Sequence, residues 1–159
     1  MIDGLVQRAC RWQPEVVISS DLQRCRLPAE AISSACGVVC EVDPVWREIY
    51  MGEWENQPWA ELQAKHPEAL DCVTKDYVTV RAPGGESYEE LADRTFAALQ
   101  RLEARPEQRL WVMTHGGVIR TVISRILGLP LKQSWAMETA YACGVLARWS
   151  GEHWKVVFN

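Results

Sequence analysis

Histidine is scarce in this sequence, and no Arg-His dipeptide occurs in its 159 residues. No apolar run reaches the roughly 18 residues that a membrane-spanning helix needs, and residues 1–13 lack the basic start and apolar stretch of a secretion signal. No dense cluster of Lys and Arg is present, and the formal net charge is −4 with a sequence pI of about 5.4. We therefore expect no membrane anchoring and no nucleic-acid partner.

The six cysteines are poorly arranged for binding a metal ion. They form no C-x-x-C pair, and the closely spaced Cys36 and Cys40 lack the second pair that would complete a zinc site. We expect reduced, mostly structural thiols, a cytoplasmic protein, and neither a metal nor another cofactor.

The remaining composition is typical of a globular protein. Hydrophobic residues make up 48% and charged residues 24% of the chain, and a chain of this length suits one domain with one core. Because no repeat, low-complexity tract or linker interrupts the sequence, we expect a single domain over residues 1–159.

Helical periodicity and capping signals predict six helices. Ser87 and Glu90 have the S-x-x-E spacing of a capping box. Pro28 is expected at the first position of its helix, and Gly128 is expected to end another. The helices are predicted at residues 3–12, 28–36, 58–65, 67–77, 87–102 and 118–127.

Short apolar runs between these helices predict five strands. They are predicted at residues 15–19, 38–42, 109–114, 142–149 and 153–158. Residues 21–26 are expected to form a turn, and residues 43–58 an irregular loop. The order of strands and helices favours an α/β sandwich with a largely parallel sheet.

The stretch VMTHGGVIR, residues 112–120, places His115 between the end of a predicted strand and a Gly-Gly turn into a helix. Ligands of open α/β sheets bind at the carboxyl ends of the strands, and the free N–H groups of a helix N-terminus suit an anion such as phosphate. Gly116 and Gly117 would let that ligand approach the backbone closely. This pattern favours a phosphate-binding His115, and the alternative is a structural histidine.

Arg24 lies in SSDLQRCR, just past the first predicted strand, and would reach the same edge of the sheet. A guanidinium there would hold phosphoryl oxygens in a bidentate fork. The alternatives are a solvated Arg24 at the surface and a phosphate-binding role for its neighbour Arg26.

Glu48 lies in WREIYMGEWE, in the loop after the second predicted strand. Among the three aromatic side chains of this loop, the pKa of its carboxyl group would be raised, so that it could act as a general acid. The alternative is a surface glutamate, and Glu53 and Glu55 stay open as candidates for the same role.

Taken together, these segments resemble the histidine phosphatase superfamily, which contains cofactor-dependent phosphoglycerate mutase and the alpha-ribazole phosphatases. SSDLQRC resembles the family's S-x-L-x-R-A segment, and EIYMGEWE resembles its E-x-x-x-G-x-W-E-G segment. GGES and HGGVIR match the family pattern closely. The resemblance covers roughly residues 3–150. It implies a three-layer α/β/α sandwich of the phosphoglycerate mutase type and metal-free phosphoryl transfer.

The resemblance also implies roles for individual residues. In the family, one histidine attacks phosphorus and forms a phosphohistidine, while two arginines and a second histidine hold the phosphoryl oxygens. An acidic residue protonates the leaving oxygen. Carried over, His115 is the phosphate-holding histidine, Arg24 and Gly116 bind phosphate beside it, and Glu48 is the general acid. The expected ligand is a small phosphorylated substrate or inorganic phosphate.

The sequence departs from the family pattern in one large respect. The family opens with a strand ending in an L-x-R-H-G motif, which supplies the nucleophilic histidine, and no such motif occurs here. We therefore expect an N-terminally shortened domain without the usual first strand, and the alternative is a divergent, rearranged member of the family. Because that strand lies inside the family's sheet, the chain has to close the gap, fill it with another segment, or pair with a second copy as a homodimer.

Three hypotheses on function follow from these observations. The first is a phosphomonoesterase that acts on a small phosphorylated metabolite and is impaired or inactive in this chain because the nucleophile is absent. The second is a non-catalytic phosphate-ester or partner-binding protein derived from that family. The third is a structural or assembly protein that uses the exposed sheet edge as its interface. Mutase activity is less favoured, because the inserts expected of a phosphoglycerate mutase do not stand out in a chain this short.

Overall fold

The computed structural model describes residues 2–157 of the chain. Its α-helices are α1 (Ile2–Trp12), α2 (Gln23–Cys36), α3 (Trp59–Lys65), α4 (Pro67–Lys75), α5 (Tyr88–Leu102) and α6 (Gly116–Leu127). Its strands are β1 (Val16–Ser19), β2 (Val39–Val42), β3 (Leu110–Met113), β4 (Leu146–Trp149) and β5 (Trp154–Val157). Three short 3₁₀ helices are η1 (Pro44–Trp46), η2 (Gly52–Trp54) and η3 (Leu131–Ala136).

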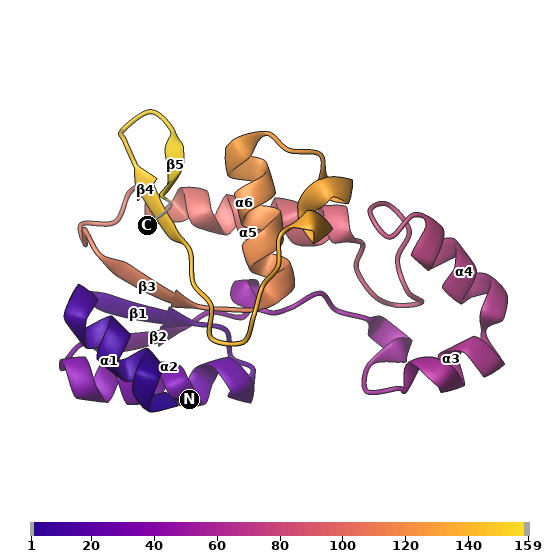
Figure 1. The fold of residues 1–159 in the computed structure, drawn as a ribbon, viewed down its shortest axis with the longest axis horizontal. Helices are drawn as coiled ribbons and strands as arrows, with labels where there is room; N and C mark the ends of the chain where they lie inside the picture. The colour runs from indigo at the N-terminus through magenta and orange to yellow at the C-terminus, as the bar shows by residue number, and fades with distance from the viewer. Residues whose placement is uncertain (1, 158–159) are drawn as a thin grey trace.

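Three layers make up the main body of the molecule (Figure 1). The middle layer is a parallel sheet in the order β2-β1-β3, in which Val16 lies opposite Val39 on one side and Leu110 on the other. Helices α1 and α2 cover one face of this sheet, and α5 and α6 cover the other. The expected α/β fold with a parallel sheet is confirmed.

The central strand β1 explains why the sheet is covered on both faces. Successive side chains of a strand point to opposite faces, and all four residues of β1 are buried. Val16 and Ile18 pack in the cluster that contains Leu91 of α5 and Val118 of α6. Val17 packs in the other cluster, which contains Leu5 and Ala9 of α1 and Ala29 and Ile32 of α2. A strand with two apolar faces therefore requires a helical layer on each side.

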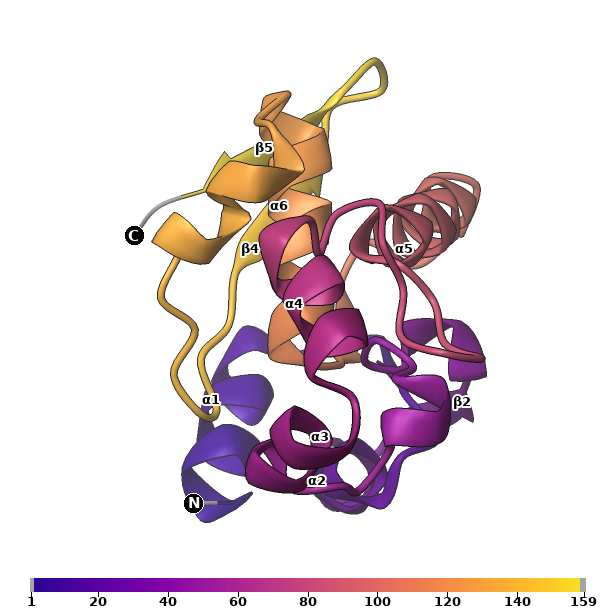
Figure 2. The same ribbon diagram turned by 90° about the vertical axis from the view of Figure 1, so that its right-hand side faces the viewer.

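Helices α3 and α4 form an excursion beside the main body, as both views show (Figure 1, Figure 2). The excursion has a small core of its own, made of Trp54, Leu62, Leu70 and Ala82. Gly52 lies where it begins, at φ 55°, and a Cβ there would come within 2.2 Å of the Pro83 carbonyl oxygen. Only glycine permits this approach, which holds η2 against the loop that precedes α5.

Most of the expected elements are present, with boundaries that differ by one to a few residues. Ser87 and Glu90 make both hydrogen bonds of the predicted capping box at the start of α5. Gly128 ends α6 in the left-handed conformation, at φ 65°. The expected strand over residues 142–149 is shorter, because it begins only at Leu146. Residue 158, predicted to belong to the last strand, lies outside the described residues.

The expected turn over residues 21–26 is wrong, because α2 already begins at Gln23. Pro28 accordingly lies inside this helix and not at its first position. Proline has no N–H and leaves the carbonyl group of Arg24 without its helical donor. Cys25, Pro28, Ala29 and Ile32 are nevertheless buried on one side of the helix, so tertiary packing outweighs the local penalty of the proline.

The strands of the described residues form two separate sheets. β3 pairs with β1 alone, and β4 and β5 form an antiparallel pair of their own. Between η3 and β4, Ala142 packs against the α1/α2 cluster together with Trp111 and Met113 of β3. Its carbonyl oxygen also accepts a hydrogen bond from Arg8 of α1. The segment before β4 thus covers part of the apolar surface next to β3.

None of the helices within residues 2–157 combines the length and the apolar character that crossing a membrane requires.

Candidate active site

His115 lies at the carboxyl end of β3 and is the N-cap residue of α6, where its side chain is only 7% exposed. The Nε of Arg24 donates a hydrogen bond to its Nδ1 at 3.1 Å. The Oγ of Ser20 lies 3.0 Å from its Nε2. Ser20 follows β1 directly and Arg24 lies in the first turn of α2, so the carboxyl ends of two adjacent parallel strands bring these side chains together.

The surroundings of His115 fix its charge and its tautomer. The pKa of the ring is lowered to about 4, mainly by burial and further by the charges of Arg24 and Arg94, while Asp21 partly offsets these effects. The ring is therefore neutral near pH 7. Because a guanidinium only donates, the Nδ1 of His115 is the acceptor in the bond from Arg24. The proton lies on Nε2, which donates to the Oγ of Ser20.

Cys25 packs against the same ring. Its Sγ lies 3.5 Å from Nε2 and 3.7 Å from Nδ1 of His115, and its thiol donates to the Thr114 carbonyl oxygen at 3.2 Å. Burial raises the pKa of this thiol to about 11. The thiolate is the nucleophilic form of cysteine, so Cys25 contributes contacts to the site and no reactive sulfur at neutral pH.

Glu48 reaches the N-terminus of α6 from the loop after η1. Its Oε2 accepts a hydrogen bond from the backbone N–H of Gly117 at 3.0 Å, and its Oε1 accepts one from the N–H of Ile49 at 3.0 Å. A Cβ on Gly117 would come within 2.2 Å of Oε1 of Glu48. A carboxylate at this position is also favoured by the positive end of the helix dipole.

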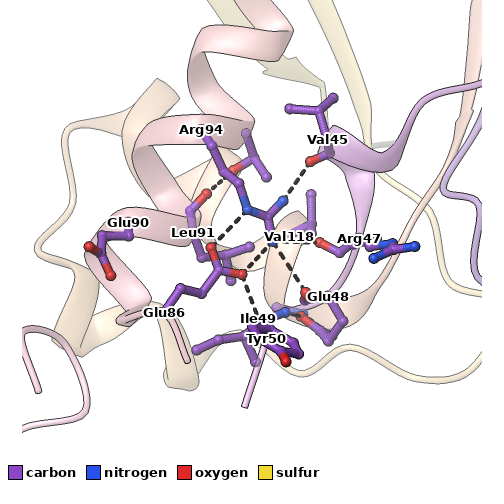
Figure 3. Close-up of polar contacts among 12 residues, drawn as sticks. Val45, Arg47, Glu48, Ile49, Tyr50, Glu86, Glu90, Leu91, Arg94 and Val118 are labelled. Atoms are coloured by element: carbon purple, nitrogen blue, oxygen red, sulfur yellow. Dashed lines mark hydrogen bonds and ion pairs between the residues drawn. The ribbon is translucent and has the colours of Figure 1, made fainter. Parts of the chain in front are cut away.

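Arg94 of α5 holds the loop that carries Glu48 (Figure 3). Its Nη1 donates to the carbonyl oxygen of Val45 at 2.5 Å, and its Nη2 donates to those of Arg47 at 3.0 Å and Glu48 at 3.2 Å. Its Nε and Nη2 also form a fork with the carboxylate of Glu86, at 2.8 and 2.6 Å. One guanidinium therefore binds three backbone carbonyl groups within residues 45–48.

Glu86, the acidic residue of GGES, joins this network from the other side. Its Oε1 accepts a hydrogen bond from the N–H of Tyr50 at 2.9 Å. Its own N–H donates to the Tyr50 carbonyl oxygen, also at 2.9 Å. Arg94 and Glu86 are 27% and 17% exposed, so their ion pair is shielded from water more than a surface pair is. The loop after η1 is thus bonded on both sides of Glu48.

The structure brings together Arg24, Glu48, His115 and Gly116, the four residues singled out in the sequence. The competing candidates from the sequence lie elsewhere. Arg26 forms an ion pair with Glu30 at 3.1 Å on the exposed side of α2. Glu53 and Glu55 are exposed, and the carboxylate of Glu55 accepts from the Met51 N–H. His66 and His153 are exposed as well.

Sequence reasoning missed Ser20, Glu86 and Arg94. Ser20 directly follows a buried strand, which is the signal that could have identified it. Glu86 lies in GGES, which matches the family pattern, but this match by itself indicated no role for the Glu86 side chain. Arg94 lies among the apolar positions of a predicted helix, between Leu91 and Thr95, and both of these neighbours are fully buried. A charged residue beside such a face requires a partner, although the sequence alone does not name it.

No group of three or more His, Cys, Asp or Glu side chains within residues 2–157 has an arrangement that could hold a metal ion.

The match to a family model and the similarities to known proteins agree with one another. The model of the histidine phosphatase superfamily, branch 1, matches residues 1–159. The probable phosphoglycerate mutase GpmB of Erwinia tasmaniensis is 37% identical over 115 residues, which are 72% of this chain and 54% of that protein. The metal-independent phosphoserine phosphatase of Arabidopsis thaliana is 36% identical over 118 residues, 72% of this chain and 49% of that protein. The chain therefore spans about half the length of the curated relatives it matches.

Solved structures show the same fold. The alpha-ribazole phosphatase from Shigella flexneri superimposes with a TM-score of 0.85 at 19% identity, covering 98% of this chain and 79% of that one. A mycobacterial glucosyl-3-phosphoglycerate phosphatase in complex with VO3 superimposes with a TM-score of 0.80 at 25% identity, covering 99% of this chain and 82% of that one. With a family match over its whole length and this fold, the chain belongs to the histidine phosphatase superfamily, branch 1.

Proposed function

We propose that this chain carries the phosphate-holding and proton-donating part of a phosphomonoesterase site for a small phosphorylated metabolite. The observation that carries the proposal is the convergence of three distant segments on the N-terminus of α6. Arg24 donates to His115, and the carboxylate of Glu48 bonds to Gly117. A guanidinium, an imidazole N–H and free helix N–H groups are the donors that a phosphoryl group requires.

Each of these groups has a role in the proposed reaction. The guanidinium of Arg24, the Nε2–H of His115 and the N–H of Gly116 bind the phosphoryl oxygens and stabilise the charge that develops on them. Glu48 is the general acid that gives a proton to the ester oxygen as the bond to phosphorus breaks. Ser20 keeps Nε2 of His115 as the donor until the ligand replaces it.

We place the nucleophile of the site outside these 159 residues. The family's phosphohistidine mechanism needs a second histidine beside the first. The other two histidines, His66 and His153, are exposed, and neither bonds to His115 or Arg24 in the part of the chain that the structure describes. Within residues 2–157, β3 pairs with no strand other than β1, and its unpaired side supports a missing neighbouring strand. We infer that the chain alone binds phosphate and turns over phosphate esters poorly or not at all.

A non-catalytic phosphate-ester or partner-binding protein is the second candidate, and the same missing histidine favours it. The free thiols support a reducing compartment such as the cytoplasm for either candidate. Homodimerisation across the open sheet edge is a separate proposal, which light scattering tests directly.

Two measurements test the proposal. Calorimetric titration with inorganic phosphate is expected to show binding that His115→Ala and Arg24→Gln each weaken at least about ten-fold. The absence of phosphate binding would refute the proposal. An assay of aryl phosphate hydrolysis, combined with trapping of any phosphohistidine, then distinguishes the phosphomonoesterase from the non-catalytic binding protein. Turnover by this chain that disappears in His115→Ala would rule out the non-catalytic candidate and the inferred lack of a nucleophile.

The proposed absence of the nucleophile is tested by supplying a segment that contains it. Co-expression with a strand segment that ends in L-x-R-H-G is expected to give aryl phosphatase activity, and replacing the histidine of that segment by alanine is expected to remove it. If the segment binds the chain stably but no activity appears, the result would support a completed sheet and refute the proposed chemistry.

A further inference from the structure

The unpaired side of β3 leaves backbone groups without partners. The N–H of Ser20 donates to the carbonyl oxygen of Met113 at 2.9 Å, so Met113 turns its backbone groups toward β1. Val112, the residue before it, therefore turns its N–H and C=O to the other side of β3. Within residues 2–157 these two groups have no hydrogen-bond partner. A strand added on this side would supply one.

Residues 140–145, which we call the strap, connect η3 to β4. Figure 1 shows the strap descending toward α1 and α2 before it turns up to β4. Ala142 packs against the α1/α2 cluster, which Trp111 and Met113 of β3 also contact. Arg8 of α1 donates to the Ala142 carbonyl oxygen at 2.5 Å. A strand added beside β3 would turn side chains to the same helical layer, so the strap and an added strand compete for one apolar surface.

The strap holds its place against a local backbone cost. Ala142 has φ 60°, in the left-handed region that disfavours a residue with a Cβ. Tyr141 is 94% exposed, so its ring gains almost no burial from this arrangement. The small side chain of Ala142 and the bond from Arg8 therefore provide the main contacts that keep the strap closed.

We propose that the strap is an autoinhibitory contact, which has to be released from α1 before a strand can add beside β3 and complete the site. The inference rests on the proposed function, because the added strand is the segment that would carry the nucleophile. The strap shields apolar surface while the strand is absent. Its backbone strain keeps it easy to displace, since release of Ala142 from the left-handed conformation offsets part of the lost packing.

Binding of the strand segment tests the strap without any chemistry. The probe is the segment that ends in L-x-R-H-G, with a fluorescent label and with its histidine replaced by alanine. Ala142→Gly relieves the strain, stabilises the strap and is expected to weaken binding about three-fold. Ala142→Val places a β-branched side chain in the left-handed region and is expected to strengthen binding about ten-fold. Arg8→Gln removes the bond to the strap and is expected to strengthen it about five-fold.

Matched variants control for composition and charge. Ala140→Gly and Ala140→Val make the same changes at an exposed strap residue that is not in the left-handed region. Arg11→Gln removes one positive charge from the same helix as Arg8. Each of these variants is expected to bind the segment within about two-fold of the wild-type affinity. Thermal melting identifies any variant that fails to fold.

Cys143, next to Ala142, reports on the strap when no segment is present. Its thiol is partly buried, whereas that of Cys72 is exposed and serves as the internal reference. Alkylation by iodoacetamide, followed by peptide mapping, is expected to be faster at Cys143 in Ala142→Val and in Arg8→Gln than in wild type. It is expected to be slower in Ala142→Gly. Saturation of the wild-type chain with the segment should also accelerate it.

The outcomes distinguish the strap from the proposed function. Equal affinity of the segment for wild type, Ala142→Gly and Ala142→Val would overturn the strap and leave the proposed function intact. Binding of the segment without faster alkylation of Cys143 would do the same, because the strap would still be closed. If the segment binds no variant although inorganic phosphate binds, the strap is overturned and the phosphate-holding site stands. If phosphate does not bind, the proposed function itself fails.

Discussion

The carboxylate of Glu48 lies directly against the backbone of Gly117. Its Oε2 accepts from the Gly117 N–H at 3.0 Å, and its Oε1 would be 2.2 Å from a Cβ on that residue. Gly117, the second glycine of HGGVIR, thus has to be glycine for a physical reason that is separate from that of Gly116. It admits the side chain that the proposed reaction uses as its acid.

Gly117→Ala is expected to lower the free energy of unfolding by about 1–3 kcal/mol, because the new methyl group displaces the Glu48 carboxylate. In a Glu48→Ala background, the same substitution should cost at least about 1 kcal/mol less, since the clash is gone and alanine favours the helix. Urea denaturation of the four proteins of this cycle measures the coupling.

Gly116→Ala is the matched control for that cycle. Its Cβ would lie 3.0 Å from Oγ1 and 3.8 Å from Cβ of Thr139 and 3.5 Å from Nη1 of Arg120. These approaches are looser than the 2.2 Å to Glu48 at Gly117, so Gly116→Ala is expected to cost less than Gly117→Ala. An equal cost of Gly117→Ala with and without the Glu48 side chain would contradict the close contact.

Arg94 is expected to stabilise the Glu48 loop in a way that lysine cannot replace. Arg94→Lys keeps the charge but cannot span Glu86 and three carbonyl groups, so the free energy of unfolding should fall by about 2–3 kcal/mol. Hydrogen exchange of the Ile49 and Tyr50 amides is expected to become faster. Arg101→Lys is the control, because Arg101 is 60% exposed and 3.6 Å from Asp43. Its effect should stay within about 0.5 kcal/mol, and a similar loss in both variants would argue against a specific role.

The neutral state of His115 makes stability depend on pH. The pKa of its ring is about 4 in the folded chain and about 6.5 in an unfolded one. As pH falls from 6.5 toward 4, the unfolded chain binds a proton that the folded chain does not, so the folded state loses stability. This loss amounts to about 3 kcal/mol at the lower end.

His115→Gln should therefore change the pH dependence and not only the stability at one pH. The free energy of unfolding of this variant, relative to wild type, is expected to improve by about 2 kcal/mol between pH 7 and pH 4.5. Urea denaturation at the two pH values measures it. His153→Gln, which removes an exposed imidazole, serves as the control. A constant difference between wild type and His115→Gln at both pH values would show that the ring is not held neutral by the fold.

Local signals in the sequence identified most elements and the four residues that converge at α6. The capping box of Ser87 and Glu90 and the glycine at 128 are signals of this local kind, because each interaction spans only a few residues. The start of α2 was predicted wrongly for the converse reason. Its position depends on burying Cys25, Ala29 and Ile32 against the sheet, which overrides the preference of Pro28 for a first turn.

The missed site residues depend on contacts between segments far apart in the chain. The carbonyl groups that Arg94 binds lie 46 to 49 residues away. Ser20 is 95 residues from His115. No periodicity or spacing records such contacts, so the sequence could place Glu48 on a loop but could not show what orients that loop.

Cys10 of α1 and Cys36 at the end of α2 form another such contact. Their Sγ atoms lie 2.7 Å apart, compared with about 2.0 Å in a disulfide. Glutathione disulfide is a suitable oxidant: one protein thiolate attacks it and releases glutathione, and the second protein thiol then displaces the other glutathione. Burial raises the pKa of the Cys36 thiol to about 11, so this reaction is expected to become faster as pH rises.

Treatment with glutathione disulfide at alkaline pH should therefore join Cys10 and Cys36, with the protein mass lower by two hydrogens and a peptide map that contains the linked pair. Because the bond closes a loop between residues 26 positions apart, the oxidised chain should be more stable by about 3 kcal/mol. Cys10→Ser is expected to abolish both effects. Cys72→Ser, which removes an exposed thiol, should leave them unchanged. Glutathionylation of the two residues without a link would contradict the contact, since adjacent thiols displace glutathione within the chain.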